Sequence, residues 1–254
     1  LTGALPPAEA IDEIWDDTAT QKMGRGILEA VIPSGEGIGR AALTMLFSHV
    51  ARRHLGKETK AILSDIWAGY DRLERDLPLA PNAGAILTTH LAALTLALHR
   101  TLVERGRSEA RSHEVIHAIG WDIYDRMADP PFEIARALTS DPAKRMRIAT
   151  GLFRSFPFGP PAYGWRDVEA GGNVVAFDCT KCPVAAFFAA HEALSLCTAT
   201  WCALDFPVAE KWGGQLVRPK TIAGGHDHCD FKWHTLPVLD KDETGEEAED
   251  AGQG

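Results

Sequence analysis

The sequence has no excess of positive charge. Its 254 residues include 26 lysines and arginines against 35 aspartates and glutamates, which gives a formal net charge of -9. Seven of the acidic residues lie in the segment 240–250, so the rest of the chain is close to balanced. A nucleic-acid-binding domain normally carries a basic patch or stripe, and none is visible here. We therefore expect no nucleic-acid partner.

Long hydrophobic runs are also missing. The most apolar stretch, residues 83–99, contains three threonines and two histidines and is shorter than the roughly 20 residues that a membrane-spanning helix needs. We interpret it as a core helix and expect no membrane partner. Residues 1–17 have neither the basic start nor the apolar run of a secretory leader. Together with an odd number of cysteines, five, this favours free thiols in the reducing cytoplasm.

The chain is long enough, and with 45% hydrophobic residues apolar enough, to bury a full core. Residues 1–155 form the first part, in which helical patterns are separated by Pro- and Gly-rich clusters at 32–39, 77–84 and 128–133. Apolar residues recur every three to four positions between Ile86 and Leu102, as on the buried face of a helix. A turn at Gly106 and a Ser108 cap then start a second helix, which predicts a helical hairpin.

The second part, residues 156–236, mixes strands and helices. Residues 165–170 and 173–179 read as a hairpin around the Gly-Gly turn at 171–172. Helices are predicted from Pro183 onward and over 199–213, where Pro207 interrupts the pattern, and two strands over 215–222 and 228–235. The predicted fold is thus α+β, a helical N-terminal part followed by a small antiparallel sheet with two packed helices. We expect the two parts to form one compact domain, followed by a disordered acidic tail, 237–254.

The stretch "FDCTKCPVAAFF", residues 177–188, holds a C-x-x-C pair, Cys179 and Cys182. Pro183 is favoured at the first position of a helix, so Cys182 is expected to cap one. A thiol at the positive end of the helix dipole has a lowered pKa, which makes Cys182 a candidate nucleophile. Cys179 lacks such donors and is expected to stay protonated. The pair also resembles a redox motif, although no βαβ pattern surrounds it, and both cysteines are equally consistent with ordinary buried residues.

A metal site is a further interpretation of the same pair. Cys179, Cys182 and Cys229, with either His226 or His228, offer the ligand types of a tetrahedral zinc site. The protein would then be a zinc-binding or small-ligand-binding regulatory module rather than an enzyme. The two groups of ligands come from separate segments, so this hypothesis depends on how the chain folds.

Three segments in order carry a resemblance: "FDCTKCPVAAFF", then "ALDFPVAEKW", then "KTIAGGHDHCDFKW". They resemble the 2-aminothiazoline-4-carboxylate hydrolase family, in which a Thr-Arg-Cys segment precedes a helix, Asp-Phe is followed by Ala-Glu, and a Cys-Asp-Phe-Arg-aromatic strand closes the pattern. The similarity covers residues 173–234 well and residues 85–130 loosely. The matching positions are Thr180, Lys181 and Cys182; Asp205, Phe206, Ala209 and Glu210; and His228, Cys229, Asp230, Phe231, Lys232 and Trp233.

The sequence also departs from the family pattern. Lys181 and Lys232 stand where arginine is usual, so a planar fork for a carboxylate is replaced by a point charge. Ala186 stands where a glutamate is common, and Cys179 lies outside the pattern. These departures affect the choice of substrate more than the family resemblance.

The resemblance implies hydrolysis of a small-molecule ring at a carbon bound to nitrogen and sulfur, without a cofactor or a metal. It implies catalytic roles for Cys182 or Cys229 as nucleophile and for His228 as a proton shuttle. Alternation along the last strand equally allows Cys229 to be a core residue. Asp178 and Asp205 are expected to orient the base or bind a substrate amine, and Lys181 or Lys232 a carboxylate. Thr180, Glu210 and Asp230 complete the predicted substrate site, while the oligomeric state stays open.

Overall fold

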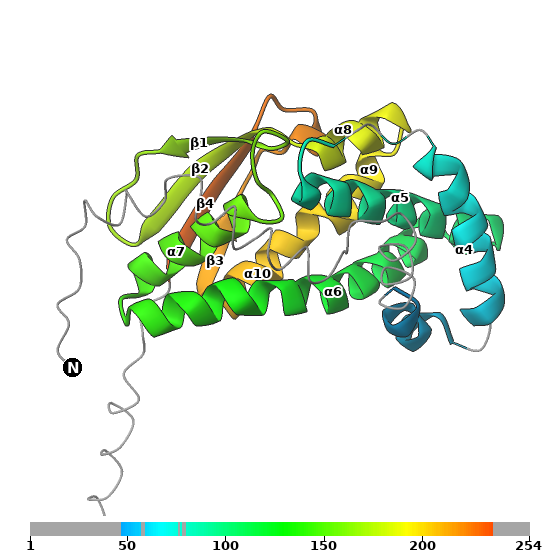
Figure 1. Ribbon diagram of the computed structural model, residues 1–254, viewed down its shortest axis with the longest axis horizontal. Helices are drawn as coiled ribbons and strands as arrows, with labels where there is room; N and C mark the ends of the chain where they lie inside the picture. The colour runs from blue at the N-terminus through cyan, green and yellow to red at the C-terminus, as the bar shows by residue number, and fades with distance from the viewer. Residues whose placement is uncertain (1–46, 57–58, 76, 78–79, 236–254) are drawn as a thin grey trace, which may run out of the picture.

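The computed structural model describes residues 47–235, except 57–58, 76 and 78–79. Three predictions lie outside these residues: the helical pieces before residue 47, the Pro- and Gly-rich cluster at 32–39 and the acidic tail. Within the described residues the chain is mostly helical with one small antiparallel sheet (Figure 1). The predicted α+β class is therefore confirmed.

The first half is a set of helices. After helical residues 47–55 come α4 (Thr59–Glu74), α5 (Ala83–Glu104), α6 (Glu109–Leu138) and α7 (Pro142–Ser155). The predicted hairpin of α5 and α6 is confirmed, because the Ser108 side chain accepts from the Arg111 backbone N–H and caps α6. Gly106 has a φ of 84° in the turn between them, a conformation that glycine adopts without strain.

Helix α6 differs from the prediction at the cluster 128–133. A break was expected there, yet the helix continues through Pro130 and Pro131 to Leu138. Each proline lacks the N–H that an interior helical position donates. However, Ala128, Pro131 and Ala135 are all buried, so packing of this face outweighs the unfavourable local propensity.

The N-terminus of α5 is docked on the loop that follows α7. Asn82 caps the helix by accepting from the Ala85 backbone N–H, and its amide donates to the carbonyl oxygens of Gly159 and Pro160. A Cβ on Gly84 would lie 2.1 Å from the Pro157 carbonyl oxygen, so only glycine allows this close approach. The contact fixes the loop from which the first strand begins.

The sheet has four antiparallel strands in the order β1-β2-β4-β3. They are β1 (Gly164–Val168), β2 (Val174–Lys181), β3 (Gly214–Val217) and β4 (Cys229–Thr235). The predicted β1–β2 hairpin and the pairing of the last two strands are confirmed. Strand β3 is shorter than predicted: Pro219, two residues past its end, has no N–H to donate to a ladder, and the chain turns into a short 3-10 helix, η3 (Ile222–Gly224).

Short helices connect β2 to β3. They are α8 (Pro183–Ala190), α9 (Leu194–Thr200), the 3-10 turn η2 (Cys202–Leu204) and α10 (Asp205–Lys211). Helix α8 begins at Pro183 with Cys182 as its cap, as predicted. The helix predicted over 199–213 is instead divided before Asp205, which places Pro207 in the first turn of α10, where a missing N–H costs no hydrogen bond.

Two apolar clusters make up the core. One joins α4 and α5 to α8 and α9, and the other lies between the sheet and helices α6, α7 and α10. Long helix α6 runs along both (Figure 1). Partly buried Cys182 and Ile222 pack against both clusters, so their surroundings are where the two meet.

Helix α5 is long and apolar enough to cross a membrane by length and composition alone. However, 56% of its apolar window is buried inside the protein, and the core helix of a soluble protein meets the same criteria. Its buried face includes Leu94, Leu98 and Leu102, which agrees with the predicted core helix, but Ile86, where the predicted buried stripe began, is exposed.

Candidate active site

One pocket is lined by all five cysteines of the sequence. Cys179 and Cys229 come from the sheet, Cys182 from the start of α8, and Cys197 and Cys202 from α9 and η2. None of them forms a disulfide. The cavity measures about 100 Å³. Since about 10 to 15 Å³ is enough for one water molecule, it can hold a small molecule of several non-hydrogen atoms.

Aromatic side chains form the floor of this pocket. Alternation in the strands turns Phe177 of β2 and Phe231 and Trp233 of β4 to the same inner face. The rings of Phe177 and Phe231 stack with centroids 5.3 Å apart. The remaining aromatic lining comes from Tyr124, Phe153, Phe158, Tyr163, Trp165, Trp201 and Trp212. The pocket therefore favours a ligand with a largely apolar or planar body.

Cys182 occupies the predicted place but does not have the predicted acidity. Its Sγ accepts from the Ala185 backbone N–H at 3.4 Å, as expected for a cap of α8. Burial nevertheless raises the pKa of Cys182 to about 12, because loss of hydration outweighs the help of the helix N-terminus. The prediction of a readily formed Cys182 thiolate is wrong for the free protein.

Cys229 has the opposite character. It faces Cys179 directly across the β2–β4 ladder. The neighbouring Cys179 thiol lowers the pKa of Cys229, and the Ile222 backbone N–H, 3.2 Å from Sγ, and the nearby Arg218 charge act in the same direction. The Cys229 thiol, together with burial, raises the pKa of Cys179, whose S–H donates to the Lys181 carbonyl oxygen at 3.3 Å. Cys179 stays protonated, as predicted, and Cys229 is the more acidic of the two thiols.

The pocket also contains a buried ion pair. Arg218, which follows β3, donates to the Asp205 carboxylate and, at 2.6 Å, to the Cys202 carbonyl oxygen. The Tyr124 hydroxyl donates to the same carboxylate at 3.0 Å. Burial raises the pKa of Asp205, while Arg218 and Tyr124 oppose this shift. The Arg218 guanidinium lies over the ring of Phe231, 4.9 Å from its centroid, at the thiol end of the floor.

Arg218 and Tyr124 were missed by the sequence prediction. Both sit in segments that read as ordinary structure, a strand and a helix stripe. A signal was present beside Arg218, since Pro219 has no N–H to donate and ends the strand ladder at this point. Its side chain is only 3% exposed, which marks a buried cation with a specific partner.

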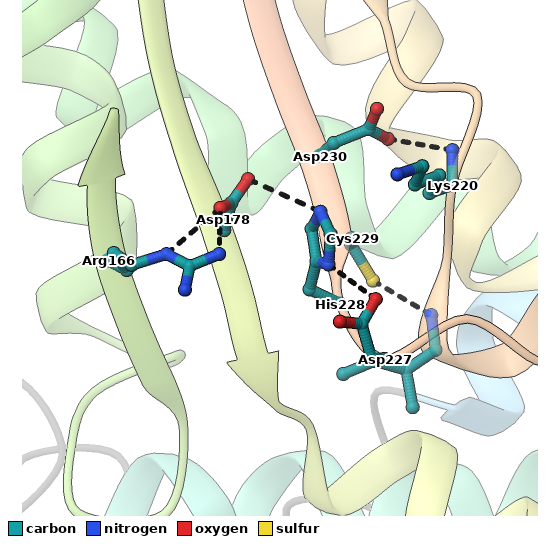
Figure 2. Close-up of polar contacts among 8 residues, drawn as sticks. Arg166, Asp178, Lys220, Asp227, His228, Cys229 and Asp230 are labelled. Carbon is teal, nitrogen blue, oxygen red and sulfur yellow. Dashed lines mark hydrogen bonds and ion pairs between the residues drawn. The ribbon is translucent and has the colours of Figure 1, made fainter. Parts of the chain in front are cut away.

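His228 lies on the other side of the sheet from the thiols. Its Nδ1 is 2.6 Å from Asp227 Oδ1 and its Nε2 is 3.9 Å from Asp178 Oδ1. Asp178 in turn accepts two hydrogen bonds from Arg166, as Figure 2 shows, while the Cys229 sulfur points to the Ile222 N–H. Asp178 and Cys179 are neighbours in β2, so alternation puts their side chains on opposite faces. The structure thus brings neither His228 nor Asp178 to the pocket.

The other predicted residues are also outside the pocket. Lys181 is exposed and donates to the Pro161 carbonyl oxygen at 3.0 Å. Asp230 accepts from the Lys220 backbone N–H at 2.7 Å and so holds the turn before β4. Thr180, Glu210 and Lys232 are exposed. Of the predicted site residues, Cys182, Cys229 and Asp205 are brought together.

The zinc hypothesis is wrong for the part of the chain that the structure describes. No group of three or more His, Cys, Asp or Glu side chains there could hold a metal ion. His226 is exposed, and His228 is on the outer face, so neither joins the cysteines. The physical cause is again strand alternation, which separates neighbours in sequence onto opposite faces.

The fold and this pocket define an α+β protein with a thiol-lined, aromatic-floored binding site. A model of the L-2-amino-thiazoline-4-carboxylic acid hydrolase family matches residues 88–233, more than half of the chain. The chain belongs to this family, as the sequence resemblance predicted. The family assignment supports a hydrolase.

Two further comparisons add little. No curated protein matches the chain. Among solved structures, the Fe(II) unliganded H-NOX protein from K. algicida matches with a TM-score of 0.40 and 10% identity, covering 78% of this chain and 96% of that one. A mutant of the same protein matches with a TM-score of 0.39 and 10% identity, covering 77% and 95%. At these scores the likeness supports no conclusion about function.

Proposed function

We propose that this chain hydrolyses a small heterocycle at a carbon bound to nitrogen and sulfur, with Cys229 as the nucleophile. One observation carries the choice of Cys229: within the pocket it alone combines the facing Cys179 thiol, a backbone N–H donor and a neighbouring cation, each of which lowers its pKa. A thiolate is the reactive form of cysteine. Cys182, whose pKa is raised to about 12, stays a neutral thiol at physiological pH.

Arg218 and Asp205 supply the binding groups for such a substrate. The Nε–H of Arg218 is buried and has no acceptor among the described residues, so it is free to donate to a substrate carboxylate. Asp205 already accepts from Arg218 and Tyr124, but a carboxylate has about four acceptor positions and can also accept from an amino group on the ring. A protonated amidine is favoured beside this negative charge.

The proposed reaction consumes one water and involves no oxidation or reduction. The Cys229 thiolate attacks the ring carbon, the carbon–sulfur bond breaks, and the ring sulfur takes up the proton of the amidinium group. This step leaves an isothiourea adduct on Cys229. Water then adds to the adduct carbon, one of its protons passes to the adduct nitrogen and the other to solvent, the Cys229 thiolate leaves, and the product is a carbamoyl amino acid with a free thiol. The small molecule itself supplies the proton for its leaving group.

The test is a panel of small cyclic amidines, thiazolines, imidazolines and hydantoin-like rings, incubated with the whole chain and read out as a mass gain of one water. We expect at least one ring to be opened, and an adduct to appear on the Cys229 peptide when the reaction is quenched early. A family member with known activity serves as the positive control. If the control is active and this chain opens none of the rings, the proposed function is wrong.

A further inference from the structure

Unpaired hydrogen-bond donors gather at the pocket. Among the described residues, five buried side-chain nitrogens have no hydrogen-bond partner, and three of them belong to residues that line this one cavity: Arg154 Nε, Arg218 Nε and Trp233 Nε1. Buried polar groups are normally hydrogen-bonded, and a buried polar group without a hydrogen bond destabilises the protein. All three groups are donors and two are cationic, so a ligand that satisfies them offers acceptors and negative charge.

These donors lie at different levels of the pocket. Cys229, Phe231 and Trp233 are alternate residues of β4 on the same face. At roughly 3.3 Å per residue, the backbone from Cys229 to Trp233 covers about 13 Å. Arg218 lies at the thiol end, over Phe231. Trp233 therefore marks the far end of the floor, too distant for the reacting group of a bare five-membered ring bound at the thiols.

Arg154 reaches the floor from α7. Its guanidinium lies over the ring of Phe177, 4.4 Å from the centroid, while Arg218 lies over Phe231 in the same stacked pair. Arg154 Nη1 is held at 2.6 Å by Asp167, which is 81% exposed, so the partner of that terminal nitrogen is at the surface. This ion pair orients the guanidinium and leaves its Nε–H without an acceptor.

We infer that Trp233 and Arg154 form a second acceptor-binding point, and that the ligand is a planar or apolar-bodied molecule with two acidic or carbonyl groups. One group pairs with Arg218 over Phe231, and the other pairs with the two remaining unmet donors, Arg154 Nε over Phe177 and Trp233 Nε1 further along β4. The body between them rests on Phe177 and Phe231. This inference rests on the proposed function only in treating the pocket as the substrate site.

Binding of inert aromatic acids tests the inference without any reaction. Benzoate carries one carboxylate, whereas terephthalate and 1,4-phenylenediacetate carry two at different spacings. Calorimetric titration of the whole chain should show that one of the two diacids binds about tenfold or more tightly than benzoate, as one additional charge-assisted hydrogen bond predicts. Equal affinity for all three acids, or no binding of any, would overturn the inference.

Variants separate the two binding points. Trp233→Phe keeps the stacked ring and removes only the N–H, and Arg154→Met removes the second cation. Either change should reduce the preference for the diacid to within about twofold while leaving benzoate affinity unchanged. Arg147→Met, an exposed arginine of the same helix α7, is the matched control and should change nothing. A variant that weakens benzoate and diacid equally contradicts the assignment.

Asp167→Asn tests whether the effect of Arg154 on diacid binding is only an effect on the stability of the fold. It removes the ion pair that orients Arg154 but leaves the Arg154 side chain in place, so the diacid preference should fall partially and the melting temperature should change little. The binding experiments test this inference independently of the proposed function. Ring opening without a diacid preference would reject only this inference, whereas diacid binding without ring opening would reject only the hydrolase mechanism.

Discussion

Cys179 and Cys229 face each other across the β2–β4 ladder, and each thiol shifts the pKa of the other. The two thiols are chemically unequal: buried Cys179, which donates to the Lys181 carbonyl oxygen, holds its proton more strongly, and Cys229, which accepts from the Ile222 N–H, releases its proton more easily. Cys182, the residue that the helix-cap argument favoured, is instead kept neutral by burial. The reactive thiol of the pocket is thus chosen by a neighbour across the sheet rather than by a helix terminus.

The first prediction concerns the order in which the thiols react. Iodoacetamide at pH 7 should modify Cys229 first, and Cys182 only slowly, because alkylation requires the thiolate. Cys179→Ala should slow the labelling of Cys229 several-fold by removing the neighbouring thiol that lowers its pKa. Peptide mass spectrometry over a time course measures both rates. Faster modification of Cys182 than of Cys229 would contradict the assignment of the nucleophile.

The second prediction concerns stability at high pH. The folded pKa of Cys182 is about 12, against an ordinary value of 9.0. Above pH 9 the unfolded chain therefore loses this proton while the folded protein keeps it, so the unfolded state binds fewer protons and the free energy of unfolding falls as pH rises from 9 towards 12. For one group the slope is about 1.4 kcal/mol per pH unit.

In Cys182→Ala the free energy of unfolding should fall less steeply with pH, by about the 1.4 kcal/mol per pH unit that one group contributes. Urea unfolding between pH 8.5 and 10.5 measures it, with Ser195→Ala, an exposed change on α9, as the control. Cys179 and Cys197 also have raised pKa values, so the wild-type slope is steeper than that of one thiol alone. An unchanged slope in the Cys182 variant would show that this thiol ionises normally in the folded state.

Local signals in the sequence were sufficient for much of the fold. The Ser108 cap, the Gly-Gly turn of the first hairpin and Pro183 at the start of α8 each act through neighbouring residues, and all three appear where predicted. The predictions failed where tertiary packing determines the local structure. Helix α6 continues through Pro130 and Pro131 because its buried face holds it against the core, and no local pattern reports that contact.

The candidate site shows the same division. Cys229 and Asp205 reach the pocket together with Cys182, but His228 does not, because a difference of one residue along a strand changes the face. The acidity of Cys229 depends on Cys179, which is fifty residues away in sequence and opposite it only in the folded sheet. The acidity of Cys182 was misjudged and Arg218 was missed for a related reason. The burial of a side chain depends on the whole fold and not only on its neighbours in sequence.

The third prediction separates His228 from catalysis. Its ring lies with Asp178 and Asp227 (Figure 2), and alternation along β2 puts Asp178 on the face opposite the thiols. His228→Ala should therefore leave kcat/KM for any opened ring within about twofold and cost less than about 1 kcal/mol in unfolding free energy, as for a surface ion pair. Steady-state kinetics and urea unfolding check both values. A loss of activity of a hundredfold or more with unchanged stability would place His228 in the reaction.

The fourth prediction concerns the buried pair of Arg218 and Asp205. Arg218→Lys keeps a positive charge near Asp205, but a single ammonium group cannot reproduce the planar fork that donates to Asp205, to the Cys202 carbonyl oxygen and, through Nε, to a substrate carboxylate. The loss falls on binding, so KM should rise by about tenfold or more while the alkylation rate of Cys229, which senses the nearby charge, changes much less.

Arg218→Met is the contrasting change. It leaves Asp205 buried without its cation, which should cost about 3 to 5 kcal/mol of unfolding free energy and slow the alkylation of Cys229 as well. Arg166→Met, which breaks the ion pair on the outer face of the sheet, is the matched control and should leave both KM and Cys229 labelling unchanged. If the lysine variant keeps the wild-type KM for carboxylate-bearing rings, Arg218 serves only the fold, and the carboxylate of the substrate must be bound elsewhere in the pocket.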